Sequence, residues 1–337
     1  MHADENAPSA EISVVVPIYN EARNLAALLE RLSPVLESCA SSFEIIFVDD
    51  GSSDESVAIL RKAHDLDPRV RLVSFSRNFG KEVAIAAGLD HAGGEAVVIM
   101  DADLQHPPEM IRAFVDKWRE GYRNVYGQRI DRAADSALRR ALTQRFYRLF
   151  ARLGDTELPA GAGDFRLLDA QAVAALRQMR ERARFSKGLY AWIGFSSAGV
   201  PFDVADRHAG QSKFSYRKLT HFALDGLMSF TTAPLRIWTY VGLATSALAL
   251  ALACFFLLRT LILGVDVPGY ASLIVSITFF GGVQLLSLGV LGEYVGRIFS
   301  EVKGRPLYLV AERLGFDARE GAARRAADAS TPRPDVA

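Results

Sequence analysis

Short apolar runs alternate with longer amphipathic stretches through the first third of the chain. The runs are rich in Val and Ile and predict strands at residues 12–17, 43–48, 71–75, 96–100 and 124–126. Between them, apolar residues recur at helical spacing and predict helices at residues 22–36, 54–64, 81–91 and 108–120. Strands that alternate with helices are typical of a parallel sheet covered by helices, so the chain is predicted to begin with an α/β domain.

Two long apolar segments, residues 237–258 and 270–292, follow much later. Each exceeds the roughly 20 residues that cross a bilayer core, and neither contains a charged side chain. They predict a transmembrane hairpin, with a buried hairpin of a soluble protein as the alternative. Basic residues flank the pair on its outer sides, whereas the connection offers only Arg259 against Asp266. The positive-inside rule then places both ends in the cytoplasm. The flanking basic residues are Arg217, Lys218, Arg236, Arg297, Lys303 and Arg305.

Amphipathic stretches connect the two parts. Residues 138–153 place apolar side chains on one helical face with arginines around it, as in a helix that lies at a membrane surface or packs on the domain. Residues 216–234 form a second, juxtamembrane stretch. The predicted layout is a disordered segment 1–11, a cytoplasmic domain 12–215, a juxtamembrane helix 216–234, a membrane hairpin 235–296 and a cytoplasmic segment 297–337 that is disordered beyond about residue 315.

Composition excludes several classes of protein. Lys plus Arg number 39, as do Asp plus Glu, which argues against a nucleic-acid binder that relies on bulk positive charge. The two cysteines, Cys39 and Cys254, form no disulfide framework. The chain also lacks a G-x-G-x-x-G turn, which argues against a dinucleotide cofactor. No signal peptide precedes the first strand, so the α/β domain is expected in the cytoplasm.

Two acidic clusters follow predicted strands, D-D-G-S-S-D at residues 49–54 and D-A-D-L-Q at residues 101–105. Both then lie at the carboxyl edge of the sheet, where open α/β sheets bind ligands. Asp101, Asp103 and Gln105 are candidate ligands of a divalent cation, Mg²⁺ or Mn²⁺, that also holds a diphosphate, and Asp103 is the first choice. The alternative is a pair of solvated acids that cap the next helix. Together the two clusters suggest a nucleotide-sugar enzyme.

Other candidate residues surround these clusters. Tyr19, in the turn after the first strand, could cover a nucleobase, and Asp50 could accept a hydrogen bond from the base or the ribose. Asp164 lies in a glycine-rich stretch that predicts a flexible loop; it could act as a general base, orient the acceptor, or only pair with Arg166 in a turn.

A trail of basic residues could hold a lipid phosphate at the bilayer surface, because guanidinium groups bind phosphate bidentately. A solvated basic face is the alternative. The trail consists of Arg129, Arg132, Arg207, Ser212 and Lys213.

The motifs P-I-Y-N-E, D-D-G-S-S-D, R-N-F-G-K, D-A-D-L-Q-H-P-P-E, G-D-F-R-L-L and R-x-x-G-x-S-K-F occur in this order. With them the chain resembles the polyprenyl-phosphate glycosyltransferases of family 2 over residues 12–306. The resemblance is strongest to the bactoprenol glucosyltransferases and the undecaprenyl-phosphate aminoarabinose transferases, and weaker to dolichol-phosphate mannose synthase. It implies a glycosyltransferase A fold, a divalent metal, inversion at the anomeric carbon and an acceptor in the bacterial inner membrane.

The resemblance also implies roles for single residues. Asp101, Asp103 and Gln105 would surround the metal, and the basic trail would meet the lipid phosphate. Asp164 matches an aspartate proposed as the base, and with Asp103 and Arg129 it makes up the expected catalytic set. His106 is a departure, since many relatives carry Asp or Asn there. The residues expected to bind the nucleotide sugar are Pro17, Tyr19, Glu21, Asp50, Lys81 and Asp101.

The expected reaction is transfer of one sugar from a nucleotide sugar to polyprenyl phosphate, for use in lipopolysaccharide, O-antigen or wall polymers. UDP-glucose is the donor expected from the resemblance; an aminoarabinose derivative, an N-acetylhexosamine or GDP-mannose are alternatives. A processive polysaccharide synthase is disfavoured because the Q-x-x-R-W motif is missing. A nucleotide-binding membrane scaffold or a carrier of lipid-linked sugars is the remaining alternative. The resemblance also suggests a homo-oligomer, with a tetramer as one form.

Overall fold

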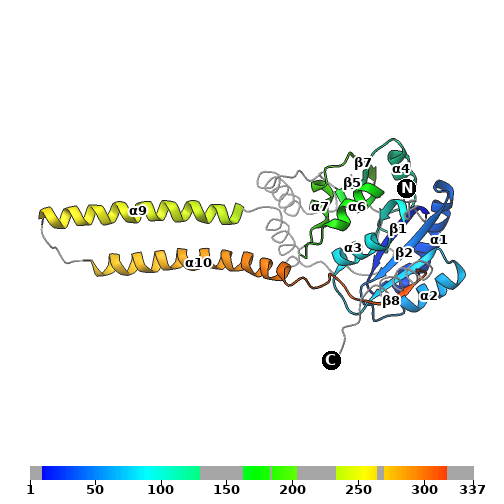
Figure 1. The fold of residues 1–337 in the computed structure, drawn as a ribbon, viewed down its shortest axis with the longest axis horizontal. Helices are drawn as coiled ribbons and strands as arrows, with labels where there is room; N and C mark the ends of the chain where they lie inside the picture. The colour runs from blue at the N-terminus through cyan, green and yellow to red at the C-terminus, as the bar shows by residue number, and fades with distance from the viewer. Residues whose placement is uncertain (1–9, 130–161, 183, 203–232, 264–268, 317–337) are drawn as a thin grey trace, which may run out of the picture.

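The computed structural model describes residues 10–129, 162–182, 184–202, 233–263 and 269–316 (Figure 1). Several sequence predictions concern residues outside these ranges. They are the helix at residues 138–153, most of the juxtamembrane stretch 216–234, and the side chains of Arg132, Arg207, Ser212 and Lys213. The terminal segments 1–9 and 317–337 also lie outside them.

A mixed, mostly parallel sheet forms the body of the molecule. Its strand order is β7-β5-β6-β4-β1-β2-β3-β8. Only β6 and β8 run antiparallel to their neighbours. The prediction of a mostly parallel α/β sheet is therefore confirmed. The strands are β1 (Ala10–Ile18), β2 (Phe43–Asp49), β3 (Val70–Phe75), β4 (Gly94–Ile99), β5 (Asn124–Arg129), β6 (Ala162–Asp169), β7 (Ser197–Phe202) and β8 (Val310–Leu314).

Helices cover both faces of the sheet, and the central strands are apolar on both sides for that reason. In β1, Val14 and Val16 belong to one core, which packs against α1 and α4, whereas Val15 belongs to a second core with residues of α3 and α6. The helices of this domain are α1 (Ala22–Cys39), α2 (Ser56–Leu66), α3 (Lys81–His91), α4 (Met110–Arg119), α6 (Ala170–Gln178) and α7 (Ser186–Trp192).

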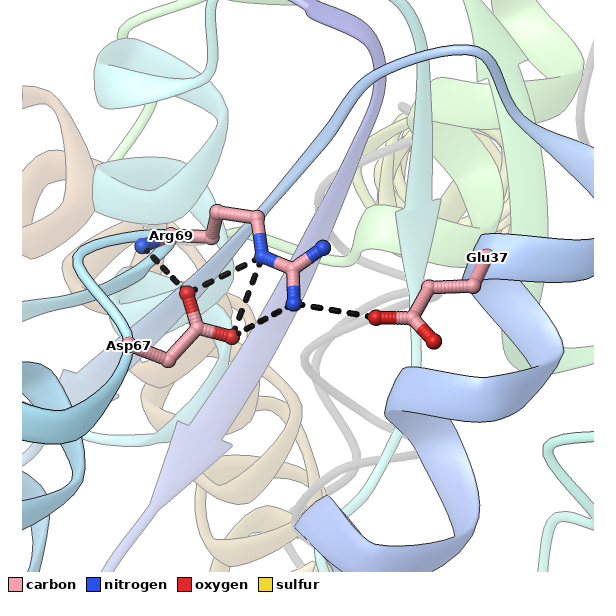
Figure 2. Close-up of polar contacts among 3 residues, drawn as sticks. All are labelled: Glu37, Asp67 and Arg69. Atoms are coloured by element: carbon pink, nitrogen blue, oxygen red, sulfur yellow. Dashed lines mark hydrogen bonds and ion pairs between the residues drawn. The ribbon is translucent and has the colours of Figure 1, made fainter.

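Polar contacts fix the turn that leads from α2 into β3. Figure 2 shows the Arg69 guanidinium between the carboxylates of Asp67, at 2.9 Å, and Glu37 of α1, at 3.0 Å. The side-chain hydrogen bond from Arg69 lowers the pKa of Asp67. Arg69 also lies 4.3 Å from the centroid of the Phe43 ring. Arg69 and Glu37 are about half exposed, so their ion pair orients the turn and adds at most about 1 kcal/mol.

Three strands differ from the sequence prediction. Residues around Asp164 were expected to form a flexible loop, but Ala162–Asp169 is β6, which pairs antiparallel with both β4 and β5. Pairing with these two strands provides hydrogen bonds for the backbone N–H and C=O groups of a segment whose local composition is typical of a loop. The sequence analysis predicts neither edge strand. β7 pairs parallel with β5 at one edge of the sheet. β8 comes after the apolar segments in the sequence and pairs with β3 at the other edge.

Two long helices, α9 (Ala233–Leu263) and α10 (Tyr270–Val302), project side by side away from the sheet (Figure 1). Within the described residues, one segment, Phe279–Val302 of α10, is long and apolar enough to cross a membrane. It overlaps the second predicted span. Large apolar side chains on both helices are exposed, among them Leu243, Phe255 and Leu285. The first predicted span lies within α9 and stays a prediction.

Candidate functional site

The acidic clusters meet at one edge of the sheet, as the sequence predicts. The strands β4, β1 and β2 are neighbours and run parallel, so their carboxyl ends coincide. Asp101 follows β4, Tyr19 follows β1, and Asp50 follows β2. Tyr19 is 40% exposed at this edge, so a ligand can reach it.

The turn after β1 is bonded to the loop after β2. Asn20 adopts a left-handed conformation with φ of 57°. Its side-chain oxygen accepts a hydrogen bond from the backbone of Ser53 at 2.8 Å, and its own N–H donates to Ser52 Oγ at 2.8 Å. Glu21 accepts from the Asn24 side chain at 2.6 Å. The two hydrogen bonds hold Asn20 in this left-handed conformation. Backbone conformations of this kind cluster at binding sites.

Asp50 secures a second loop. Its carboxylate accepts hydrogen bonds from the backbone N–H groups of Phe79 at 2.6 Å and Gly80 at 2.9 Å. Burial raises the pKa of Asp50 against the opposing effect of these bonds. Asp50 therefore positions the loop that precedes α3. Gly51 permits the close approach, because a Cβ there would lie 2.6 Å from the backbone carbon of Arg77.

The D-x-D loop after β4 is a tight turn. Leu104 is buried with φ of 62°, and Asp103 Oδ1 accepts from the N–H of Gln105 at 3.2 Å. His106 stacks on Phe165 with ring centroids 4.8 Å apart, and its Nδ1 accepts from the Asp101 N–H at 3.4 Å. Burial lowers the pKa of His106, so the ring is a neutral support for the loop. The departure at His106 therefore keeps the two acids in place.

Lys81, the first residue of α3, connects two carboxylates of the site. Its ammonium nitrogen lies 2.6 Å from Asp101 Oδ1 and 3.2 Å from Asp164 Oδ2. Burial would lower the pKa of Lys81, but the two carboxylates outweigh it and raise that pKa above its ordinary value. Three elements, α3, the loop after β4 and β6, thus bring a cation and two anions to one point.

Asp164 lies on β6, and its carboxyl group is ionised. Burial would raise its pKa, but Lys81, Lys187 and Arg166 together hold that pKa well below its usual range. Its Oδ1 is buried and has no hydrogen-bond partner among the described residues. A buried carboxylate oxygen without a donor is costly, so a substrate hydroxyl or another donor is expected to supply one.

Arg166 and Glu82 also influence Asp164 through their charges, and of the two the sequence analysis names only Arg166. The Arg166 guanidinium is buried with its central carbon 3.7 Å from the centroid of the Tyr190 ring. Glu82 accepts hydrogen bonds from the backbone and hydroxyl groups of Ser186, at the start of α7. Burial and then the charge of Asp164 raise the pKa of Glu82. The only local signal was the position of Glu82 next to Lys81.

The donor set fits a hard divalent cation that shares its coordination with a substrate. Asp101 and Asp103 supply carboxylate oxygens. Both oxygens of Asp101 contact the Lys81 ammonium, so a bound cation would share Asp101 with Lys81 or displace it. Within the described residues, no three His, Cys, Asp or Glu side chains form a metal-binding group. A Mg²⁺ or Mn²⁺ ion bound by one or two carboxylates takes its other oxygens from phosphate and water.

The basic trail is only partly described. The backbone of Arg129 ends β5, which lies beside β6 and its Asp164. The other members of the trail lie outside the described residues: Arg132, Arg207, Ser212 and Lys213. That they lie close to Arg129 stays a prediction.

Residues 13–177 match the family described as glycosyl transferase family 2. An uncharacterized glycosyltransferase of Synechocystis sp. is 50% identical over 91% of this chain and 96% of that protein. The chain belongs to glycosyltransferase family 2. Within the family it is 42% identical to a bactoprenol glucosyl transferase of Shigella phage SfII, over 89% of this chain and 97% of that protein. It is 41% identical to a bactoprenol glucosyl transferase of Shigella phage SfX, over 90% of this chain and 99% of that protein.

Solved structures give more distant similarities for this family 2 chain. Glucosyl-3-phosphoglycerate synthase of Mycobacterium tuberculosis, in complex with Mn²⁺ and UDP-glucose, is 19% identical with a TM-score of 0.43, over 64% of this chain and 76% of that one. Mannosyl-3-phosphoglycerate synthase of Rubrobacter xylanophilus is 16% identical with a TM-score of 0.45, over 77% and 78%.

Proposed function

We propose that the enzyme transfers glucose from UDP-glucose to bactoprenol phosphate, a polyprenyl phosphate, with inversion at the anomeric carbon. A phosphate oxygen of the lipid forms the new bond to that carbon while the bond to the diphosphate breaks, and UDP leaves. The observation that carries the proposal is the 42% identity to a bactoprenol glucosyl transferase over nearly the whole length of both chains. The convergence of Asp101 and Asp164 on Lys81 supports it from the structure.

Donor binding is assigned to the edge where the central strands end. Tyr19 would cover the base, and the loop that Asp50 holds would close one side of the nucleotide. Pro17 and Glu21 belong to the turn that carries Tyr19. Lys81, which is 43% exposed, is accessible to the diphosphate. Another nucleotide sugar, such as an aminoarabinose derivative or GDP-mannose, remains the alternative donor.

A divalent metal, when bound, would neutralise the charge that develops on the departing diphosphate. Asp101, Asp103 and Gln105 are the residues that would hold it. Their loop is already shaped by the left-handed Leu104 and by the support of His106.

Asp164 is proposed to position the reactants instead of accepting a proton. A phosphate monoester has a second pKa near 6, so the acceptor is largely ionised at neutral pH and needs no base. The Asp164 carboxylate pairs with Lys81 and has a pKa below its usual range, which makes it a weak base. Its unpartnered Oδ1 instead suits a sugar hydroxyl.

The membrane layout is part of the proposal. The α10 segment Phe279–Val302 is the candidate membrane helix, and α9 would supply the second span. The catalytic domain and both termini would then lie in the cytoplasm of a bacterium, at the inner membrane. The lipid phosphate would meet Arg129, Arg132, Arg207, Ser212 and Lys213 at the bilayer surface, and the enzyme would assemble as a homo-oligomer.

The proposal is tested with purified protein in vesicles that contain undecaprenyl phosphate and Mg²⁺ or Mn²⁺. Each of a panel of radiolabelled UDP- and GDP-sugars is supplied in turn, and label extracted into organic solvent is counted. Label from UDP-glucose alone supports the proposal. Label from a different donor alone would correct the sugar, and no label from any donor would contradict the reaction.

A further inference from the structure

The chain that leaves α10 returns to the catalytic domain and is bonded to it at several points. We define residues 301–314, from the last turn of α10 through β8, as the return strap. Figure 1 shows it running from the end of α10 to the sheet edge. The strap begins with the last two residues of the candidate membrane helix, Phe279–Val302, so any restraint on it is a restraint between that helix and the active site.

The first anchor is strand pairing. β8 pairs antiparallel with β3, with Ser74 opposite Glu312, and the Ser76 N–H donates to the Leu309 carbonyl at 3.0 Å. Arg61 of α2 holds Glu312 with two hydrogen bonds, of 2.9 and 2.6 Å, in the bidentate geometry that adds directional specificity.

The second anchor is Tyr308. Its ring stacks on Phe75 with centroids 5.0 Å apart, and its hydroxyl donates to Asp90 at 2.9 Å. Asp90 also pairs with Arg180 at 2.7 Å. Asp90 lies in the last turn of α3, and Lys81 begins the same helix. The strap therefore holds the far end of the helix whose first residue connects Asp101 and Asp164.

The third anchor lies at the end of α10 itself. Glu301 accepts a hydrogen bond from the Arg182 N–H at 2.7 Å. Arg182 belongs to the short connection before α7, and α7 begins with Ser186, which donates to Glu82 beside Lys81. α3 is thus bonded to the strap through Asp90, and the connection that leads into α7 is bonded to the end of α10 through Arg182.

We propose that the return strap sets the height and orientation of the active site over the membrane surface, and so positions it for an acceptor phosphate that only a bilayer presents. This inference rests on the proposed function. The acceptor phosphate lies at a fixed depth in the bilayer surface, so the reaction rate depends on where the domain holds the active site relative to that surface. A shift of about 1 Å between reacting groups can lower the rate on the order of 100-fold. Strap residues are positioning residues, because their anchoring contacts are with Arg61, Asp90 and Arg182 and not with the acidic cluster around Lys81.

The test inserts six residues, Gly-Ser-Gly-Ser-Gly-Ser, between Lys303 and Gly304, which lie between α10 and Tyr308. Such a linker behaves as a flexible coil and separates the β8 and Tyr308 anchors from the helix. The insertion is combined with Glu301→Ala, because the Glu301 side chain lies before the insertion and would otherwise still bond the end of α10 to Arg182. The control places the same insertion after Phe316, beyond β8. Three quantities are measured: transfer to undecaprenyl phosphate in vesicles, transfer to a water-soluble short-chain prenyl phosphate, and affinity for UDP.

For the insertion after Lys303, we expect kcat/KM with the vesicle acceptor to fall about tenfold or more, while the soluble acceptor and UDP affinity change less than about twofold. The control insertion is expected to leave all three near the unaltered values. An unchanged vesicle reaction, or an equal loss with both acceptors, would overturn the positioning role. No transfer by the unaltered protein to either acceptor would instead overturn the proposed function, and this inference with it.

Discussion

The ammonium nitrogen of Lys81 lies 3.2 Å from Oδ2 of Asp164, and this ion pair joins the start of α3 to β6. The same nitrogen contacts Asp101 in the loop after β4. One cation thus keeps two carboxylates close together that would otherwise repel each other. We propose that this ion pair lies at the reaction centre, where Lys81 would face the negative charge of the departing diphosphate.

Replacing Lys81 by methionine should separate activity from stability. We expect Lys81→Met to lower kcat/KM for transfer about 100-fold, as for loss of one preorganised charged group. The variant should stay folded, but its unfolding free energy should fall by about 1–3 kcal/mol, because the mostly buried Asp164 carboxylate loses its ion-pair partner. Lys117→Met is the matched control, since Lys117 pairs with Glu120 on the surface. Equal transfer by the two variants would remove Lys81 from the site.

Asp103→Ala should abolish metal-dependent transfer. A cation that keeps only one of two carboxylate ligands binds weakly, so we expect a loss of about 100-fold or more. Binding of Mn²⁺ followed by electron paramagnetic resonance should weaken in the same variant, while its thermal unfolding and membrane insertion stay unchanged. Substantial Mg²⁺- or Mn²⁺-dependent turnover by Asp103→Ala would rule out the metal role of this residue.

The pH dependence distinguishes a positioning Asp164 from a general base. Because its pKa is lowered in the folded state, the stabilisation from its charged form is complete at neutral pH and is lost only in the acid range, below about pH 4. The acid limb of kcat/KM should therefore come from the acceptor phosphate and lie near pH 6. We expect Asp164→Asn to lower the rate while keeping that limb. Loss of the limb in the variant would identify Asp164 as the base.

Gly51 is expected to be sensitive to a single added methyl group. Its φ is 74°, and a Cβ would meet the backbone of Arg77 at 2.6 Å and of Asn78 at 2.8 Å. Gly121→Ala is the control, because Gly121 also has a positive φ, of 101°, but open space around it. We expect Gly51→Ala to lower the unfolding free energy by about 2 kcal/mol more than the control, as measured by denaturant titration. Equal losses of unfolding free energy in the two variants would show that the backbone at Arg77 and Asn78 shifts to accommodate the added methyl group.

The central sheet and its acidic edge could be predicted from the sequence because their signals are local. β-branched runs such as residues 43–48 mark strands, and topology then places Asp50 and Asp101 together. The position of Asp164 could not be predicted in this way. Glycines before it are typical of a loop, and only pairing with β4 and β5 makes β6 a strand. β8 was missed for the same reason, since its partner β3 lies more than 200 residues earlier.

Analysis of the nucleotide product tests the central claim most directly. UDP-glucose is added to protein in vesicles that contain undecaprenyl phosphate and Mg²⁺. The released nucleotide is identified by chromatography, and the mass of the lipid is measured by mass spectrometry. Transfer of glucose alone predicts UDP together with a lipid heavier by one hexose residue, in equal amounts. Release of UMP, which would mean transfer of a sugar phosphate, or of UDP with free glucose and an unchanged lipid, would contradict the account.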